Sequence, residues 1–494
     1  MSPTLIEFAG CIAASILLSA VYTYFTRLVW HPLAKFPGPK LAGASRLYEV
    51  YHQVYKSDWL ENLSALHDKY GPLIRIGPNE LHSIDNQWNL QHHRRRDLKK
   101  CTDYYGVLDT VLGGFQQPHH HAARGSIVRP LFTGSILADF SDGPLNDLTE
   151  KLLQRMTSVA EKNSKLDATH LIWAFTTDIM LLYVLREDSR YIDMEDIEKF
   201  HDETRALSVI DYATVLRTMP LVNLVINYFP ALKGLSVHSW IEKRVRTHLH
   251  SNEEKRPYGD TILSRLRSRL DDETAIQEAA QAIFIGNESM LSNLTFIIHH
   301  LIHNPDSVRC LRQELYAADA TESLDATASQ GRNPIWRSSR VAQLPYLDAV
   351  LRESTRLSAP AWHRQPRAID EVLEYDNKEI PPMTSFSFTL RLLERDPARY
   401  SDPDKFVPDR WLRATKETQD LKHMSATFGT GSRTCLGQHI ARQVLRKTIA
   451  CLVYHFDFAL WDPQKDHAEN YRYMATFPQK GKEGTLQLRL KPRF

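Results

Sequence analysis

The longest apolar stretch of the chain lies at its N-terminus. Residues 5–29 include only two charged side chains, Glu7 and Arg27, and a helix of this length spans the roughly 30 Å hydrocarbon core of a bilayer. Aromatic residues gather near the end of the stretch and lysines follow it, which is typical of a membrane interface on the cytosolic side. Because no small-residue cleavage site is evident, the pattern favours a retained anchor over residues 1–30 rather than a cleaved signal peptide.

A Pro- and Gly-rich segment separates this stretch from the rest of the chain. The sequence Phe36-Pro37-Gly38-Pro39 cannot continue a helix, so we expect a stiff hinge over residues 31–40. We find no internal repeat and no composition shift after the hinge. We therefore expect one folded domain over residues 41–494 on the cytosolic side of its anchor.

Hydrophobic periodicity predicts that this domain is mainly helical, with a minor β part. Helical spacing dominates residues 139–313 and breaks near Pro220, Pro230 and Pro257. The remaining predictions are short strands over residues 72–84, further strands over residues 364–387 on both sides of Pro381-Pro382, a final hairpin over residues 471–490, and a polar surface loop over residues 318–340.

Composition narrows the class of protein. With 494 residues, of which 43% are hydrophobic, the chain can bury a large core. The net charge of +2 gives no reason to expect a nucleic acid or another strongly charged partner. The five cysteines are odd in number and form no C-x-x-C pair, which argues against a disulfide framework or a zinc site and favours a reducing compartment. The run His119-His120-His121 suggests a metal ligand or, more simply, exposed side chains.

One cysteine stands in a loop suited to chemistry. Cys435 is preceded by glycines, by Arg433 and by Phe428, and is followed by Gly437 and a helical pattern from Gln438. The N–H groups of a tight loop and the positive end of a helix stabilise a thiolate, and glycines let a flat ligand approach closely. The alternative is a buried structural cysteine.

The stretch from Phe428 to Gly437 fills every fixed position of the pattern F-x-x-G-x-R-x-C-x-G, and so resembles the haem-binding loop of the cytochrome P450 family. The resemblance extends from the apolar N-terminus to the last predicted hairpin and is strongest to fungal members of the endoplasmic reticulum. It implies the P450 fold, a haem, and Cys435 as the axial ligand of the haem iron.

A second motif follows from the same resemblance. Glu353 and Arg356 lie three residues apart in an apolar helical stretch, so both side chains occupy one helix face. Arg410 belongs to the later segment Phe406-Val-Pro-Asp-Arg-Trp411, which matches a further family pattern. The resemblance implies that Glu353, Arg356 and Arg410 form a buried structural network behind the haem.

The predicted helix over residues 279–303 resembles the oxygen-activation helix of the family. Gly286 and Glu288 match the pattern, whereas Ser289 stands where threonine is usual and Met290 replaces the next residue. The resemblance implies proton delivery by Glu288 and Ser289, because a serine hydroxyl donates and accepts as threonine does. The alternative is that the Ser289 hydroxyl only bonds its own helix backbone.

The haem propionates require cations. The family often provides an aromatic or His residue and an arginine four positions later, before a proline. His120 and Arg124 have this spacing, but counting back from Pro130 selects His121 and Gly125 instead, so the two registers differ by one residue. By resemblance we add Arg433 and Arg364 to the candidates; the alternative for each arginine is a solvated surface charge.

The resemblance implies a monooxygenase of fungal secondary metabolism. Electrons would come from NADPH through cytochrome P450 reductase, with cytochrome b5 as a possible second donor, at the endoplasmic reticulum membrane. The substrate would be lipophilic: a terpenoid, polyketide or alkaloid intermediate. Expected pocket walls are residues 104–115, 283–289, 358–363 and 475–477, and the basic residues expected to dock the reductase, or else to form a solvated face, are Arg433, Arg442, Arg446 and Lys447.

Other functions stay open at this point. The departure at Ser289 and Met290 also fits a reductase-independent haem-thiolate isomerase or dehydratase. A haem-binding protein without catalytic activity and a hydroxylase of fatty acids or xenobiotics are further alternatives. The isomerase or dehydratase would turn over without NADPH, and the haem-binding protein would bind ligands without forming product.

Overall fold

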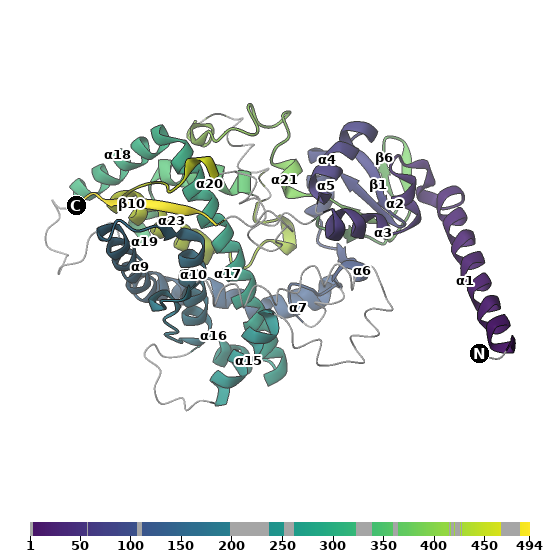
Figure 1. Cartoon of the computed structure of the whole chain (residues 1–494), viewed down its shortest axis with the longest axis horizontal. Helices are drawn as coiled ribbons and strands as arrows, with labels where there is room; N and C mark the ends of the chain where they lie inside the picture. Colours follow the sequence, from purple (N-terminus) through teal and green to yellow (C-terminus); the bar gives the residue numbers. More distant parts are fainter. Residues whose placement is uncertain are drawn as a thin grey trace.

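The computed structural model is mainly helical, with three small sheets (Figure 1). It describes residues 3–56, 58–105, 111–197, 237–250, 261–322, 338–358, 364–413, 415, 419, 425, 427–465 and 485–494. The predicted helix breaks at Pro220, Pro230 and Pro257 lie outside these residues. So do most of the predicted loop, at 323–337, the first part of the predicted final hairpin, at 471–484, and the pocket walls at 106–110, 359–363 and 475–477.

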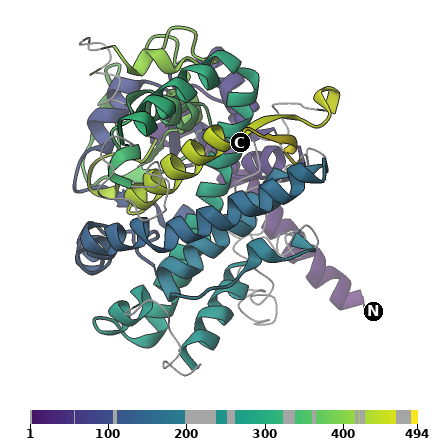
Figure 2. The ribbon, with the colours of Figure 1, turned by 90° about the vertical axis from the view of Figure 1, so that its left-hand side faces the viewer.

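The largest core forms around two long helices, α10 (Ala168–Leu185) and α17 (Asp272–His303). All 18 residues of α10 are buried, and the helix packs along α17. The contact is close, because a Cβ atom on Gly286 would lie only 2.6 Å from Cε of Met180. Helices α9 (Pro144–Glu161), α20 (Pro345–Ser358) and α23 (Gln438–His455) pack around this pair, and the views in Figures 1 and 2 show them crossing the same half of the molecule.

The domain contains further helices. Their bounds are α2 (Lys40–Ala44), α3 (Leu47–Val50), α4 (Trp59–Tyr70), α5 (Asn86–His93), α6 (Thr102–Tyr105), α7 (Pro118–Val128), α8 (Gly134–Asp142), α15 (Val237–His250), α16 (Ile262–Arg267), α18 (Pro305–Glu322), α19 (Ser338–Val341) and α21 (Leu390–Leu393), with 3-10 or π turns at η1 (Pro32–Lys35), η2 (Tyr51–Tyr55), η8 (Pro408–Trp411) and η9 (Gly431–Arg433).

The largest sheet has the strand order β1-β2-β8-β5-β3 and packs its inner face against a second, smaller core. Its strands are β1 (Leu73–Gly77), β2 (Glu80–Ser83), β8 (Ser385–Ser387), β5 (Arg367–Ala368) and β3 (Lys99–Lys100). The hairpin predicted over residues 72–84 is confirmed, because β1 and β2 pair antiparallel with Leu73 opposite Ser83. The strands predicted over residues 364–387 are confirmed as β5, β8 and the separate hairpin of β6 (Leu373–Tyr375) and β7 (Lys378–Ile380).

The C-terminal strand pairs differently from the prediction. β10 (Gln487–Pro492) lies antiparallel to β9 (Phe456–Leu460), which directly follows α23, and also pairs with β4 (Leu166–Asp167). The first strand of the final hairpin is therefore earlier in the chain than residue 471. The alternating pattern was correct for β10, but strand pairing depends on tertiary contacts that a local pattern does not contain.

Of the prediction for the N-terminus, the helix is confirmed and its place in a membrane is not. α1 (Pro3–Val29) is continuous and extends away from the folded body (Figure 1). Over the described residues, α10 is the one helix found to be long and apolar enough to cross a membrane, and it is completely buried in the protein. A transmembrane role of α1 is not shown.

Candidate functional site

The Cys435 loop is a compact turn that ends at the start of α23. The backbone N–H of Cys435 donates to the carbonyl oxygen of Phe428 at 2.8 Å and closes the loop. Gly429 and Gly431 have φ values of +73° and +67°, which residues with a side chain rarely adopt. A Cβ atom on Gly431 would also lie 2.9 Å from the carbonyl oxygen of Arg94. Glycine is therefore required at these positions by the geometry of the loop.

The thiol of Cys435 receives hydrogen bonds from the protein backbone. The N–H groups of Gly437 and Gln438 point at its sulfur, where α23 begins, and Arg442 adds a nearby positive charge. Burial nevertheless raises the pKa of the thiol, because its surroundings are poor in water. The Cys435 residue is nevertheless accessible from open space. Together these facts describe a sulfur that lies deep in the protein and faces open space, where a ligand can reach it.

Cationic side chains gather beside this loop. Arg433 donates to the carbonyl oxygens of Phe115 and Gln116 at 3.0 and 3.3 Å, and its pKa is lowered to about 10 by burial and by the charge of Arg367. Arg129 donates to the carbonyl oxygen of Ser432 at 2.7 Å. We call Lys100, Arg129, Arg367 and Arg433 the cation cluster, and His121 lies among them.

The cation cluster has no internal counter-charge. Burial and the charges of Arg433, Lys100, Arg129 and Arg367 lower the pKa of His121 to about 3, so this histidine is neutral. Burial, Arg367 and Arg433 hold the pKa of Lys100 well below its usual value. Among the described residues, no carboxylate forms an ion pair with any member of the cluster. Such a group of repelling cations is suited to an anionic ligand.

The structure resolves the conflict between the two predicted registers. His121 is buried in the cation cluster, whereas His120 is exposed on α7. The second position of this register is Gly125, and the side chain of Arg129 lies over it: a Cβ atom there would be 3.2 Å from Nε of Arg129. Arg129, one turn further along the chain, therefore provides a cation near the site. Sequence reasoning missed it because it searched for a fixed spacing.

Arg124 lies in a different environment from the predicted one. Its Nη1 forms an ion pair with Glu278 at 2.8 Å, and Glu278 also accepts from the N–H of Leu112. This buried pair connects α7 to α17. The positive charge of Arg124 is thus already balanced, and the structure does not bring it into the cation cluster.

Arg364 is also engaged elsewhere, and the prediction that it serves an anionic ligand does not agree with the structure. It is 4% exposed, and its guanidinium pairs with Glu49 and with Glu80, the latter at 2.6 Å. Arg367, three residues later in β5, is the arginine near Arg433 and His121. The sequence offers both arginines, and the tertiary contacts of each one decide between them.

Glu353 accepts hydrogen bonds from five donors. Arg356 binds it with Nε at 3.0 Å and Nη2 at 2.8 Å, and Arg410 with Nε at 3.0 Å. The indole of Trp411 and the N–H of Val407 supply the other two, at 2.8 and 3.0 Å. Glu353 and Arg356 are completely buried. The structure thus brings the three predicted residues together and adds Trp411, which sequence reasoning named only as part of its segment.

The middle of α17 combines an exposed apolar residue with a bonded hydroxyl. Ile285 is 49% exposed although the helix crosses the core, so this part of α17 borders open space. The hydroxyl of Ser289 donates to the carbonyl oxygen of Gly286 at 3.3 Å, as expected for a serine that bonds its own helix. Glu288, on the same turn, is partly buried.

The predicted basic docking face is not a free surface. Lys447 is buried and donates to the carbonyl oxygen of Ser141 and to Asn146. Arg446 pairs with Asp348 at 2.6 Å. The guanidinium of Arg442 lies 4.9 Å from the ring centre of Phe428. These positions look exposed in a helical projection, but packing of α23 against α8 and α9 covers part of them.

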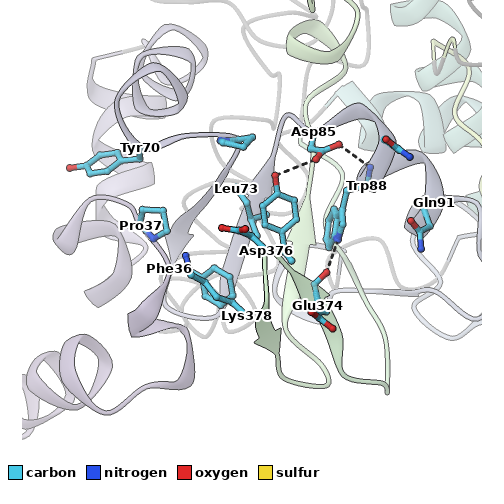
Figure 3. A pocket seen from close by; sticks show the side chains of 13 residues that line it. Phe36, Pro37, Tyr70, Leu73, Asp85, Trp88, Gln91, Glu374, Asp376 and Lys378 are labelled. Carbon is cyan, nitrogen blue, oxygen red and sulfur yellow. Dashed lines mark hydrogen bonds between the residues drawn. The ribbon is translucent and has the colours of Figure 1, made fainter. Parts of the chain in front are cut away.

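A groove of about 550 Å³ lies far from Cys435 in the chain and contains none of the predicted site residues (Figure 3). Asp85 organises one side of it, because its carboxylate accepts from the N–H of Trp88 at 3.0 Å and from the hydroxyl of Tyr375 at 3.2 Å. The indole N–H of Trp88 donates to the carbonyl oxygen of Glu374 at 3.2 Å, so these polar groups bind one another. We therefore do not assign the chemistry of the protein to this groove.

Comparison with known proteins identifies the family. The family model described as Cytochrome P450 matches residues 115–484. The chain belongs to the cytochrome P450 family. It is accordingly an oxidoreductase of the monooxygenase type, a haem-thiolate protein by family, and family members generally depend on a redox partner.

The curated relatives are fungal P450 proteins of secondary metabolism. The chain is 29% identical to conidiogenone synthase of Penicillium rubens, over 94% of this chain and 95% of the relative. It is 27% identical to tryptophan 6-hydroxylase of Fusarium equiseti, over 94% and 93%. It is 28% identical to a cytochrome P450 monooxygenase of Aspergillus parasiticus, over 92% and 93%. Two relatives with differently named activities are thus almost equally similar.

The residues present fit a haem. A sulfur that accepts two backbone N–H bonds can be held as the thiolate that binds iron. No carboxylate of the described residues pairs with the cation cluster, and a haem carries two carboxylates. Both requirements meet in one place, because Arg433 belongs to the cation cluster and lies two residues before Cys435.

Proposed function

We propose that Cys435 binds the haem iron through its thiolate and that the cation cluster binds the haem propionates. The observation that carries the proposal is the meeting of an N–H-bonded sulfur with buried cations that lack a carboxylate partner in the described part of the chain. The bound haem supplies activation of dioxygen and transfer of one oxygen atom to the substrate. Glu353, Arg356 and Arg410 hold the structure behind the loop.

The chain contributes the proton path and the walls of the substrate site. We infer that the Ser289 hydroxyl holds a proton at its Oγ and that Glu288 replenishes this proton by way of water, since adjacent side chains of a helix do not face each other. The bond of Ser289 to the Gly286 carbonyl keeps the hydroxyl on the helix surface at 3.3 Å, a long bond that a better partner can replace. Ile285, which is exposed in the middle of α17, supports an apolar wall nearby.

The substrate is inferred to be lipophilic and to belong to secondary metabolism, as a terpenoid, polyketide or alkaloid intermediate. The similarity to fungal relatives supports this class, although the relatives with named activities differ from one another. We infer that electrons come from NADPH through cytochrome P450 reductase, with cytochrome b5 as a second donor.

We also infer that α1 anchors the protein in the endoplasmic reticulum membrane. Leu17, Leu18, Val21, Tyr22 and Phe25 are 49–70% exposed on this helix. Apolar side chains exposed in such a group are unusual in a soluble protein and suit a lipid environment.

The first experiment is the carbon monoxide difference spectrum of the reduced holoprotein. We expect a Soret band at the thiolate position in the parent protein, and its loss in Cys435→Ser. Cys451→Ser is the matched control, because Cys451 is buried in α23 outside the loop. A thiolate band that persists in Cys435→Ser, or a histidine-type band in the parent, would contradict the proposal.

The activity itself is tested by reconstitution with the reductase. Candidate terpenoids, polyketides and alkaloids are screened for binding by the shift that they cause in the Soret band of the haem. Those that bind are incubated with the reductase, NADPH and dioxygen. We expect product that contains one oxygen atom from dioxygen and that depends on the reductase. Product formation without NADPH would point to rearrangement or dehydration instead.

A further inference from the structure

The junction between α1 and the folded domain is built around one buried arginine. Arg75, in β1, is 4% exposed. Its guanidinium donates to the carbonyl oxygens of Arg27 at 2.9 Å, Pro78 at 2.6 Å and Gly77 at 3.3 Å. No carboxylate pairs with it in the part of the chain that the structure describes. Burial and the nearby charge of Arg27 lower its pKa to about 10.

The bond to Arg27 reaches the last turn of α1. The final carbonyl oxygens of a helix have no partner within the helix, and a cation at this end also interacts favourably with the helix dipole. Arg75 supplies both a donor and a charge. Arg27 in turn donates from Nη1 to the carbonyl oxygen of Ala44 at the end of α2, at 2.7 Å. The two arginines therefore connect α1 to β1 and to α2.

The segment between α1 and α2 is packed rather than free. The N–H of Arg75 donates to the carbonyl oxygen of Pro37 at 2.7 Å. Gly38 has φ +152°, and a Cβ atom there would lie 2.3 Å from the carbonyl oxygen of Arg75. Phe36 is 6% exposed in the core that contains Leu73, and Figure 3 shows Phe36 and Pro37 on the wall of the groove beside it. The hinge predicted from sequence is thus fixed to the domain.

An apolar surface continues from this junction. Leu41, Leu47, Tyr51 and Tyr55 are 46–78% exposed, and the last three are spaced four residues apart along α3 and η2, so that they share one side of the helical segment. The rings of Tyr51 and Tyr55 stack with centroids 5.4 Å apart. We call these four residues the tyrosine stripe. Helices α2 and α3, which contain Leu41 and Leu47, lie beside the end of α1 (Figure 1), and Lys40 and Lys56 flank the stripe in the sequence.

We propose that Arg75 locks α1 to β1 and so holds the tyrosine stripe in the headgroup region of the phospholipid bilayer that α1 enters. The proposal rests on the membrane anchor proposed above. Tyrosine and lysine side chains favour this region, because each combines an apolar body with a polar end. The catalytic domain therefore sits on the membrane at one fixed orientation, instead of moving on a flexible tether.

The test measures where spin labels lie relative to the bilayer in the full-length holoprotein. Vesicles contain phosphatidylcholine and phosphatidylserine, and the background is Cys11→Ser with Cys310→Ser. Labels are placed one at a time by Ser19→Cys in α1, Tyr55→Cys in the tyrosine stripe and Val372→Cys, an exposed site on the domain. Power saturation compares the accessibility of each label to oxygen, which enters the bilayer, and to a water-soluble nickel complex.

Arg75→Met removes the three guanidinium hydrogen bonds and the charge. Arg75→Lys keeps the charge but cannot reproduce the planar set of N–H donors. The matched control is Arg95→Met, since Arg95 pairs with Asp97 and Glu371 at the surface. We expect the Tyr55→Cys label to favour oxygen in the parent and in Arg95→Met. In Arg75→Met it should reach the nickel accessibility of the Val372→Cys label, with Arg75→Lys between the two. The Ser19→Cys label should favour oxygen throughout.

The outcomes separate the two proposals. A Tyr55→Cys label that favours nickel in the parent would overturn the bilayer contact, and one that Arg75→Met and Arg75→Lys leave unchanged would overturn the lock. A Ser19→Cys label that favours nickel would refute the membrane anchor itself, and with it this inference. The carbon monoxide spectrum of each variant verifies that the domain is folded, so that a change in label position reports orientation.

Discussion

Two buried groups of cations in this protein differ in what balances their charge. In the first, Glu353 sits between Arg356 and Arg410 and accepts five hydrogen bonds, so the network is complete within the protein. In the second, the cation cluster has no carboxylate partner among the described residues, and its members lower one another's pKa values. We expect the balanced group to stabilise the fold, and we propose that an anionic ligand completes the unbalanced group.

The largest effect is expected where the balanced group is broken. Glu353→Gln leaves two buried guanidinium groups without a counter-charge, which should lower the free energy of unfolding by about 3–5 kcal/mol. Thermal and urea unfolding of the purified holoprotein measure this loss. Glu371→Gln is the control, because Glu371 pairs with Arg95 at the exposed surface and such pairs contribute about 0–1 kcal/mol. Equal stability of the two variants would show that the Glu353 network is not a structural element.

The second prediction is that a change in the unbalanced group has opposite effects on haem binding and on the stability of the haem-free protein. Arg367→Met should weaken haem binding by about 10- to 100-fold, since a charged hydrogen bond contributes about 1.5–3 kcal/mol. The same change should leave the haem-free protein as stable as the parent or more stable, because it relieves repulsion. Haem transfer to an acceptor protein and urea unfolding of the haem-free form measure the two effects.

Arg364→Met provides the contrast to that variant. Because it leaves the buried carboxylates of Glu49 and Glu80 with Arg46 as their remaining cationic partner, it should destabilise the protein both with and without haem. If Arg367→Met destabilised the haem-free form as much as Arg364→Met does, the cation cluster would not be unbalanced.

The third prediction follows from the pKa of His121, which is lowered to about 3. A histidine whose pKa is lowered on folding contributes stability above its unfolded pKa of about 6.5, and this contribution is lost as the pH falls below that value. Between pH 7.5 and 5.5, the haem-free parent should lose about 1 kcal/mol more than His121→Phe. Urea unfolding at both pH values measures the difference. His120→Phe, at the exposed neighbouring position, should behave as the parent does.

The smallest effect is expected outside both groups. Ser289→Thr adds a methyl group that restricts the side-chain rotamer on α17. This restriction corresponds to a free energy of about 0.5 kcal/mol. Haem binding and stability should remain unchanged, while the amount of product formed per NADPH rises by about twofold. Product and NADPH are measured together with the reconstituted reductase. An unchanged ratio would show that the missing methyl group does not limit proton delivery by the Ser289 hydroxyl.

Residues close together in sequence were predictable, and contacts between distant elements were not. Glu353 and Arg356 share one helix turn, and the Cys435 loop is a single continuous segment, so local spacing was enough to place them. The choice between His120 and His121 depends on which side of α7 faces the core. Lys447 was predicted as a surface charge and is buried, because α23 packs against other helices on more than one side.

The sequence by itself determined the family, the Cys435 loop, the carboxylate and arginines behind it, and the helical character of the domain. These features depend on motifs and periodicities that occupy short, continuous stretches. Only the tertiary structure decided that Arg367 and Arg129, rather than Arg364 and Arg124, join the cation cluster, and that Arg75 fixes the junction of α1. The physical reason is that the role of a buried charge depends on whether a counter-charge from a distant segment reaches it, and the sequence does not contain that distance.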